Sequence, residues 1–240
     1  GLRATNHVAP HFAKSIERPL RYEAMSESLV QGIHRFPAGH FAWLRKGETT
    51  LQPQRYWDTR EHIETVPGRF EDQVEGLRER FEEASKIRLR ADVPIATALS
   101  GGVDSSVIYA SIQHHLGDKR INHKAITADY GTSSIDETPY AMKVAAHFGN
   151  TLEPVRIDAS SALNGLEGDL NVFEEVYLSA PSPMIALYRK MKEQGITVSL
   201  DGHGADELMG GYKGTAPIGL FGAFPQVSNM RNLLLAEDRS

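Results

Sequence analysis

Residues 99–106 read Leu99-Ser100-Gly101-Gly102-Val103-Asp104-Ser105-Ser106. The stretch follows an apolar run from Pro94 that is typical of a buried strand, and it precedes a helical pattern. Two consecutive glycines permit a tight turn, and the first turn of a helix presents unpaired N–H groups. With its three serine hydroxyls, the loop is suited to a polyanion such as pyrophosphate. Composition alone leaves open an ordinary glycine turn in which Asp104 or Ser105 caps the helix.

Strands and helices alternate around this loop. Four apolar residues from Val107 to Leu116 share a helical face, and Gly117 follows them as a helix terminator. Further strands are predicted over 121–128, 151–157 and 196–200, and further helices over 141–148, 161–178 and 184–191. The alternation predicts an α/β fold, a doubly wound parallel sheet.

The part of the chain before this pattern is less regular. Residues 34–44 mix Pro, Gly, His and aromatic side chains, which favours a short strand or hairpin. From Phe70 to about Arg90, apolar residues recur at helical spacing, which predicts an amphipathic helix. We expect a domain boundary between residues 58 and 68, where Pro67-Gly68 precedes the helix.

The composition excludes several classes of protein. A length of 240 residues suits one large domain or one domain with an appendage, and 40% hydrophobic with 24% charged residues does not favour disorder. The net charge of -5 disfavours nucleic-acid binding. The chain has no cysteine, which excludes disulfides and a cysteine nucleophile within it and is compatible with the cytoplasm. No apolar run approaches the roughly 18 residues of a membrane span, so we expect no membrane partner.

A second glycine-rich run follows the last predicted strand. It reads Asp201-Gly202-His203-Gly204-Ala205-Asp206-Glu207-Leu208-Met209-Gly210-Gly211-Tyr212. Because the carboxyl ends of parallel strands meet at one edge of a sheet, this run and the loop at 99–106 can line one crevice. Carboxylates such as Asp206 and Glu207 suit Mg²⁺ carried by a nucleotide. For this acidic pair taken alone, a solvated loop is the simpler explanation.

Three better-known motifs do not fit. The chain has no Gly-Lys-Ser or Gly-Lys-Thr, which a Walker A loop requires. Residues 202–207 begin like a dinucleotide fingerprint but end in Glu207 instead of glycine. Ala98 stands where a nucleophile elbow needs glycine, which disfavours a serine hydrolase that uses Ser100. We interpret His114-His115 as helix surface and not as metal ligands.

Together these motifs resemble the synthetase domain of the glutamine-hydrolysing asparagine synthetase family, within the ATP pyrophosphatase (PP-loop) superfamily. Residues 100–106 look like the pyrophosphate loop of the superfamily, and residues 201–212 look like the second signature of the family. Four further segments resemble the family in order and spacing, namely 32–40, 55–58, 136–141 and 182–184. The resemblance implies an adenine nucleotide alpha hydrolase-like fold for residues 58–240, the N-terminal portion of the synthetase domain. It makes residues 1–57 the trailing segment of a glutaminase-type domain.

The resemblance also implies an activity. The side-chain carboxylate of aspartate would attack the α-phosphorus of ATP and release pyrophosphate. Ammonia derived from glutamine would then form the amide and release AMP. Two alternatives remain open: amidation of another carboxylate, on a sugar or natural-product precursor, and a nucleotide-binding remnant without catalysis. The expected partners are these small molecules and a glutaminase domain in the parent chain, and a homodimer is compatible with the sequence. We expect the 240 residues alone to have little activity.

ATP and Mg²⁺ are the implied cofactors. The residues implied to bind ATP are Leu99, Ser100, Gly101, Gly102, Val103, Asp104, Ser105, Ser106, Thr127, Asp201 and Gly202. Asp104 and Asp206 are implied to hold the metal, and these two residues with His203 are the implied catalytic residues. His203 departs from the family, in which glutamate or glutamine usually stands, and this leaves the acceptor open. An imidazole brings no fixed negative charge, and an ordinary loop histidine is the alternative.

Overall fold

A computed structural model of the chain describes residues 25–28, 30–117, 123–173, 181–209 and 211. The chain forms two compact units. The first contains residues 1–77 and 163–182, and the second contains residues 78–162 and 183–240. No helix among the described residues is both long enough and apolar enough to cross a membrane.

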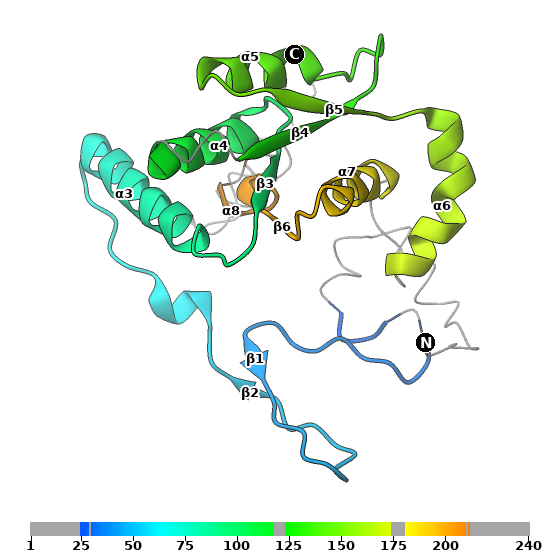
Figure 1. The fold of residues 1–240 in the computed structure, drawn as a ribbon. Coiled ribbons are helices and arrows are strands. Elements are labelled where there is room, and N and C mark those ends of the chain that lie inside the picture. The colour runs from blue at the N-terminus through cyan, green and yellow to red at the C-terminus, as the bar shows by residue number, and fades with distance from the viewer. Residues whose placement is uncertain (1–24, 29, 118–122, 174–180, 210, 212–240) are drawn as a thin grey trace, which may run out of the picture. The chain divides into compact units, whose positions relative to one another are not determined.

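Four parallel strands form the sheet of the second unit (Figure 1). They are β3 (Ile95–Ala98), β4 (Lys124–Asp129), β5 (Leu152–Arg156) and β6 (Val198–Ser199), in the order β5-β4-β3-β6. The chain builds outward from β3 to β5 and then returns to the other side of β3. This reversal creates a switch point between β3 and β6, the position at which open α/β sheets bind ligands.

Helices cover both faces of this sheet, each over its own core (Figure 1). α4 (Val103–Leu116) and α5 (Thr138–His147) pack on one face, and α7 (Ser182–Glu193) packs on the other. The first core contains Leu99, Tyr109, Ala125, Ala141 and Ala145, and the second contains Ala96, Ile126, Leu187, Met191 and Ile196. Neighbouring residues of β4 thus enter opposite cores, as the two-residue period of a strand requires. The predicted doubly wound α/β fold is confirmed.

The predicted elements of the second unit are present, but their ends differ from the predicted ones by up to about four residues, as where α4 begins at Val103 and its apolar stripe was predicted from Val107. Gly117, Gly149 and Gly195 have φ values of 52°, 72° and 73° beyond α4, α5 and α7, and Gly117 was predicted as a helix terminator. α6 (Ala159–Phe173) begins two residues before its prediction, because Asp158 accepts hydrogen bonds from both N and Oγ of Ser161 at 2.9 Å. Its predicted continuation from 174 to 178, and the predicted strand start at 121–122, lie outside the described residues.

The helix predicted at 70–90 is α3 (Phe70–Arg88), but its apolar stripe is not buried. Phe70, Val74 and Leu77 are 71%, 48% and 51% exposed, and α3 contains no buried residue. In its second half, Glu82 accepts a hydrogen bond of 3.1 Å from Ser111 Oγ and lies 2.7 Å from His115 Nε2, which joins α3 to α4. Of the two histidines interpreted as helix surface, His115 is therefore in a contact between helices.

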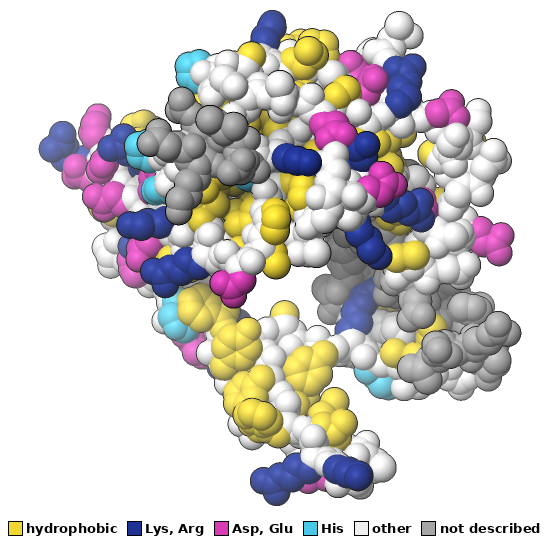
Figure 2. Space-filling model, in the orientation of Figure 1, with side chains coloured by type: hydrophobic (Ala, Val, Ile, Leu, Met, Phe, Trp, Pro, Cys, Tyr) yellow, Lys and Arg dark blue, Asp and Glu magenta, His cyan; other side chains and the backbone are white. Residues whose placement is uncertain are grey.

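The first unit contains a small antiparallel pair, β1 (His40–Phe41) and β2 (Gln54–Arg55). The strand predicted within 34–44 is present, but it pairs with a segment outside that range. Hydrophobic side chains gather over β1 and β2 (Figure 2). Among the exposed aromatic residues of this unit, Phe41 and Tyr56 have their ring centroids 6.3 Å apart.

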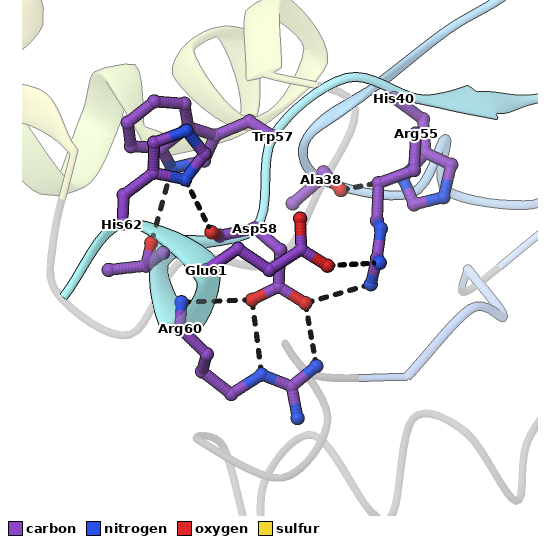
Figure 3. A network of polar contacts seen from close by, with 9 residues as sticks. Ala38, His40, Arg55, Trp57, Asp58, Arg60, Glu61 and His62 are labelled. Carbon is purple, nitrogen blue, oxygen red and sulfur yellow. Dashed lines mark hydrogen bonds and ion pairs between the residues drawn. The ribbon is translucent and has the colours of Figure 1, made fainter.

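An ion-pair network orders the chain between β2 and the short 3₁₀ helix η1 (Thr59–His62) (Figure 3). The Asp58 carboxylate caps η1 by accepting from Arg60 N at 3.0 Å, and it also binds the guanidinium groups of Arg60 at 2.7 Å and Arg55 at 2.8 Å. The hydrogen bonds from Arg60 hold the pKa of Asp58 well below its ordinary value. Trp57 and His62 stack beside this network with ring centroids 3.9 Å apart.

Candidate active site

The carboxyl ends of β3, β4 and β6 border a cavity of about 560 Å³ within the second unit. This volume is in the range of small-molecule sites, and the cavity lies at the switch point of the sheet. Most of the residues implied to bind ATP line it, as do His203 and Asp206. The exceptions are Gly101, Ser106 and Asp201.

Hydrogen bonds within the loop after β3 give it a defined shape. Ser100 Oγ lies 2.9 Å from Ser105 Oγ and accepts from Gly102 N at 3.1 Å. Gly102 is the N-cap residue of α4 and provides no side-chain capping hydrogen bond, nor does Asp104 or Ser105. The side-chain cap by Asp104 or Ser105, left open from composition, is therefore absent. The uncapped first turn of α4 presents N–H groups suited to an anion at the cavity.

Gly101 is required by the packing of this loop against α5. Its φ is 85°, and a Cβ there would lie 2.4 Å from Ala141 N and 2.6 Å from the Tyr140 carbonyl carbon. Both contacts are with backbone, so no side-chain movement could relieve them. Gly101 packs against α5 and does not line the cavity.

The loop after β6 makes direct contact with the first loop. A Cβ on Gly202 would lie 2.8 Å from Ser105 N and 3.2 Å from Asp104 Cβ. The structure thus brings together the two glycine-rich runs, which are separated by about a hundred residues along the chain. Within the second loop, Gly204 has a φ of 88°, and α8 (Ala205–Met209) carries Asp206.

The described lining of the cavity contains both acidic and apolar residues. It includes the carboxylates of Asp104, Glu137 and Asp206, and it includes no Lys or Arg. Phosphate groups entering beside these carboxylates need a cation, and one or two carboxylates plus phosphate oxygens is the ligand set that Mg²⁺ takes. No group of three or more His, Asp or Glu that could hold a metal by itself occurs in the described parts of the chain. The donor set therefore fits an ion that arrives with a nucleotide.

The apolar wall contains residues to which the sequence analysis assigned no role. This apolar wall consists of Ile126, Met184 and Leu187. Thr127, which also lines the cavity, is 1% exposed. Such apolar residues suit the flat face of a base, while the polar residues of the lining suit phosphates. The segment 182–184 had been noted for its resemblance, and the helical spacing of Met184 and Tyr188 was visible, but neither signal shows which face of α7 meets a cavity.

Tyr130 and Glu137 line the cavity from the loop between β4 and α5, and they also lack a role in the sequence analysis. Asp136 holds this loop, because its Oδ1 accepts from Tyr130 N and from Thr138 Oγ1, both at 2.9 Å. The first of these bonds is the main reason that the pKa of Asp136 is lowered. Burial, with a smaller contribution from Glu137, raises the pKa of the Tyr130 hydroxyl.

Three of the predicted site residues are placed in unexpected ways. Ser106 Oγ is buried without a hydrogen-bond partner among the described residues, and Ser106 is not part of the cavity lining. The Asp201 carboxylate is turned into the protein, where it has three hydrogen-bond donors. The His203 side chain is 61% exposed at the rim, with Nδ1 4.0 Å from Asp201 Oδ2.

The geometry disfavours a hydrolase that uses Ser100 as its nucleophile. A serine nucleophile needs a base within hydrogen-bonding reach, most often histidine. The hydroxyl of Ser100 is instead bonded to Ser105 and Gly102, and no histidine of the described residues contacts it.

The fold and the crevice define the class of the second unit as a doubly wound α/β domain with a ligand cavity at its switch point. Within that class, the profile of the asparagine synthase family matches residues 76–239. The chain belongs to the asparagine synthase family. This agrees with the resemblance found in the motifs.

Curated relatives agree with this assignment. The chain is 33% identical over 225 residues to "Amidase chry2" of Gibberella zeae, a match that covers 85% of this chain and 32% of that protein. It is 31% identical to "Amidase chyE" of Penicillium rubens, with 85% and 32% covered. It is 28% identical to asparagine synthetase B [glutamine-hydrolyzing] of Escherichia coli, with 75% and 34% covered. The chain thus spans about a third of the length of these relatives.

Among solved structures, an NH3-dependent NAD synthetase from Campylobacter jejuni matches at a TM-score of 0.40 and 17% identity, covering 57% of this chain and 60% of that one. The fold assignment rests on the strand order and not on this partial match.

Proposed function

We propose that this chain is the ATP-binding synthetase part of an enzyme that converts the side-chain carboxylate of aspartate into an amide. The observation that supports this most strongly is the contact between the two glycine-rich loops, with Gly202 against Ser105 at the cavity. The ammonia would come from glutamine, through a glutaminase-type domain of the parent chain for which residues 1–57 form the trailing segment.

The proposed reaction has two substitutions. An oxygen of the substrate carboxylate attacks the α-phosphorus of ATP, the bond from that phosphorus to the bridging oxygen breaks, and pyrophosphate leaves. The nitrogen of ammonia then attacks the acyl carbon of the adenylate, AMP leaves with its oxygen, and loss of a proton gives the amide. Negative charge grows on the departing phosphates in the first step, which makes stabilisation of that charge the main task of the site.

The residues of this chain have distinct parts in that task. The first-turn N–H groups of α4 and the hydroxyls of Ser100 and Ser105 would face the phosphates, in an arrangement that their own hydrogen bonds fix in advance. Asp104 and Asp206 would hold Mg²⁺, which supplies positive charge to the phosphates when it is bound. The apolar wall of Ile126, Met184 and Leu187 would seat the adenosine and keep water from the activated acyl group.

A second candidate function is amidation of a different carboxylate, and His203 favours it. The imidazole stands at the rim in place of the family's glutamate or glutamine and carries no fixed negative charge. In addition, the two relatives with 33% and 31% identity are named amidases. A natural-product or sugar precursor with a carboxylate is the alternative acceptor.

The test uses the full-length protein that carries this chain, supplied with Mg²⁺, ATP, glutamine and aspartate. We expect pyrophosphate, AMP and asparagine in equal amounts, measured by a coupled pyrophosphate assay and by mass spectrometry of the product. Pyrophosphate release with another carboxylic acid but not with aspartate would favour the second candidate function, amidation of a different carboxylate. No release with any acid would favour the nucleotide-binding remnant.

A further inference from the structure

We infer that the Asp201 side chain is a positioning residue, which holds the loop after β6 onto β3 and α7 and thereby sets the contact between the two glycine-rich loops. The inference rests on the proposed function, because it assigns a part within the same nucleotide site. We call Asp201 with its partners Ala98, Ser199 and Tyr188 the Asp201 clasp. A contact between the nucleotide and the backbone at 201–202 remains compatible with this part.

The contacts of Asp201 point into the protein. Its Oδ1 accepts from Ala98 N at 2.7 Å and from Ser199 Oγ at 2.5 Å, and its Oδ2 accepts from Tyr188 OH at 3.0 Å. These donors come from the end of β3, from β6 and from α7. The side chain is only 8% exposed, and Asp201 is not among the residues that line the cavity. The carboxylate is thus engaged by the scaffold and not by the cavity.

The position of the clasp couples the two loops. Ala98 is two residues before Ser100, so the bond to its N–H fixes the start of the first loop. Asp201 is directly followed by Gly202, which packs against Ser105 N. One carboxylate therefore holds both sides of the contact. Loss of this carboxylate would leave the Ala98 N–H without its partner and would release Gly202 from Ser105, and a buried polar group without a partner is costly.

Two substitutions at this position separate geometry from charge. In Asp201→Asn, the remaining oxygen can still accept from Ala98 and Ser199, and the new amide can donate to the Tyr188 oxygen, so the clasp persists without its negative charge. In Asp201→Ala, all three contacts are lost. A positioning role predicts that alanine is much worse than asparagine, whereas a direct role in binding Mg²⁺ predicts that both are severe.

The first test needs no nucleotide. Amide hydrogen exchange of the full-length protein without ATP is measured for peptides that cover residues 96–106 and 200–206. Asp201→Ala should speed exchange in both peptides at least about tenfold, and Asp201→Asn less than about threefold. The exposed carboxylate of Asp92 provides the matched control Asp92→Asn, which should leave both peptides unchanged. Unchanged exchange in Asp201→Ala would overturn the inference.

The second test is a KM-against-kcat comparison for ATP in the pyrophosphate assay. Asp201→Ala should raise KM at least about tenfold with a smaller effect on kcat, and Asp201→Asn should raise KM about threefold. Equal losses in the two variants would overturn the inference in favour of a charge contact. If the wild-type protein released no pyrophosphate, the proposed function would be wrong. The exchange experiment would still show whether the Asp201 clasp holds the two loops.

Tyr188 provides an independent check of the clasp. Tyr188→Phe removes one of the three donors, so its effect on exchange at 200–206 should fall between those of the two Asp201 variants. In the Asp201→Ala background it should add nothing, because the partner is already absent. Tyr56→Phe, at an exposed tyrosine of the first unit, is the matched control. Full additivity of Tyr188→Phe and Asp201→Ala would contradict the clasp.

Discussion

Gly101→Ala offers a quantitative test of how the first loop is held. The alanine must adopt a φ of 85°, and left-handed backbone costs a residue with a Cβ about 1–2 kcal/mol. Its Cβ would also lie 2.4 Å from Ala141 N, and making room in a packed region costs about 1–3 kcal/mol. We therefore expect a loss of about 2–5 kcal/mol in the free energy of unfolding, a large share of the roughly 5–15 kcal/mol of a typical domain.

Gly149→Ala is the matched control, because Gly149 has a φ of 72° but no atom of the described parts of the chain within 4 Å of its Cβ position. It should lose only the conformational part, about 1–2 kcal/mol. Native-state hydrogen exchange of peptides from β4 in the full-length protein measures the stability of the second unit for both variants. Equal losses at the two glycines would refute the packing of the loop against α5.

Three further predictions concern a buried histidine, the proposed metal ligand Asp104 and the ion-pair network of the first unit. His123 is 6% exposed, with Nε2 3.0 Å from Thr97 Oγ1, and burial lowers its pKa to about 4. As the pH falls, the histidine of the unfolded chain is protonated before that of the folded chain. The free energy of unfolding should therefore fall by at most about 3 kcal/mol between pH 6.5 and 4. His123→Asn should flatten that fall in urea titrations at several pH values, and an identical pH dependence would contradict the burial of a neutral imidazole. Asp104→Ala should lower ATP turnover at least about a hundredfold with the circular dichroism spectrum retained, because a proposed metal ligand in the first turn of α4 is lost. Unchanged pyrophosphate release would contradict a role of Asp104 in the site. Arg60→Gln should raise the pKa of Asp58 toward its ordinary value in an NMR titration, and an unmoved pKa would show that the network in Figure 3 is not its cause.

The position of the cavity was predictable, because it depends on order along the chain. A glycine loop directly after the strand at 95–98 and another directly after the strand at 198–199 must end at the same edge of a parallel sheet. The period of the apolar residues also predicted α3, α4, α5 and α7, since each has a repeat that only a helix places on one face.

What the sequence analysis missed depends on contacts between distant segments. The direction of the Asp201 side chain is decided by Ala98, on another strand, and by Tyr188, on α7. The register of α4 turns Ser106 away from the cavity although its neighbour Ser105 lines it. Likewise, a helical period predicts that Phe70 and Leu77 share a side of α3, but it does not show what covers them.

The central claim is that the two loops bind one nucleotide together. Hydrogen exchange of the full-length protein with and without Mg²⁺ and ATP tests it directly, with peptides that cover residues 98–106 and 200–206. We predict that ATP slows exchange in both peptides over the same range of ATP concentration. Slower exchange in only one of them, or in neither, would contradict the claim.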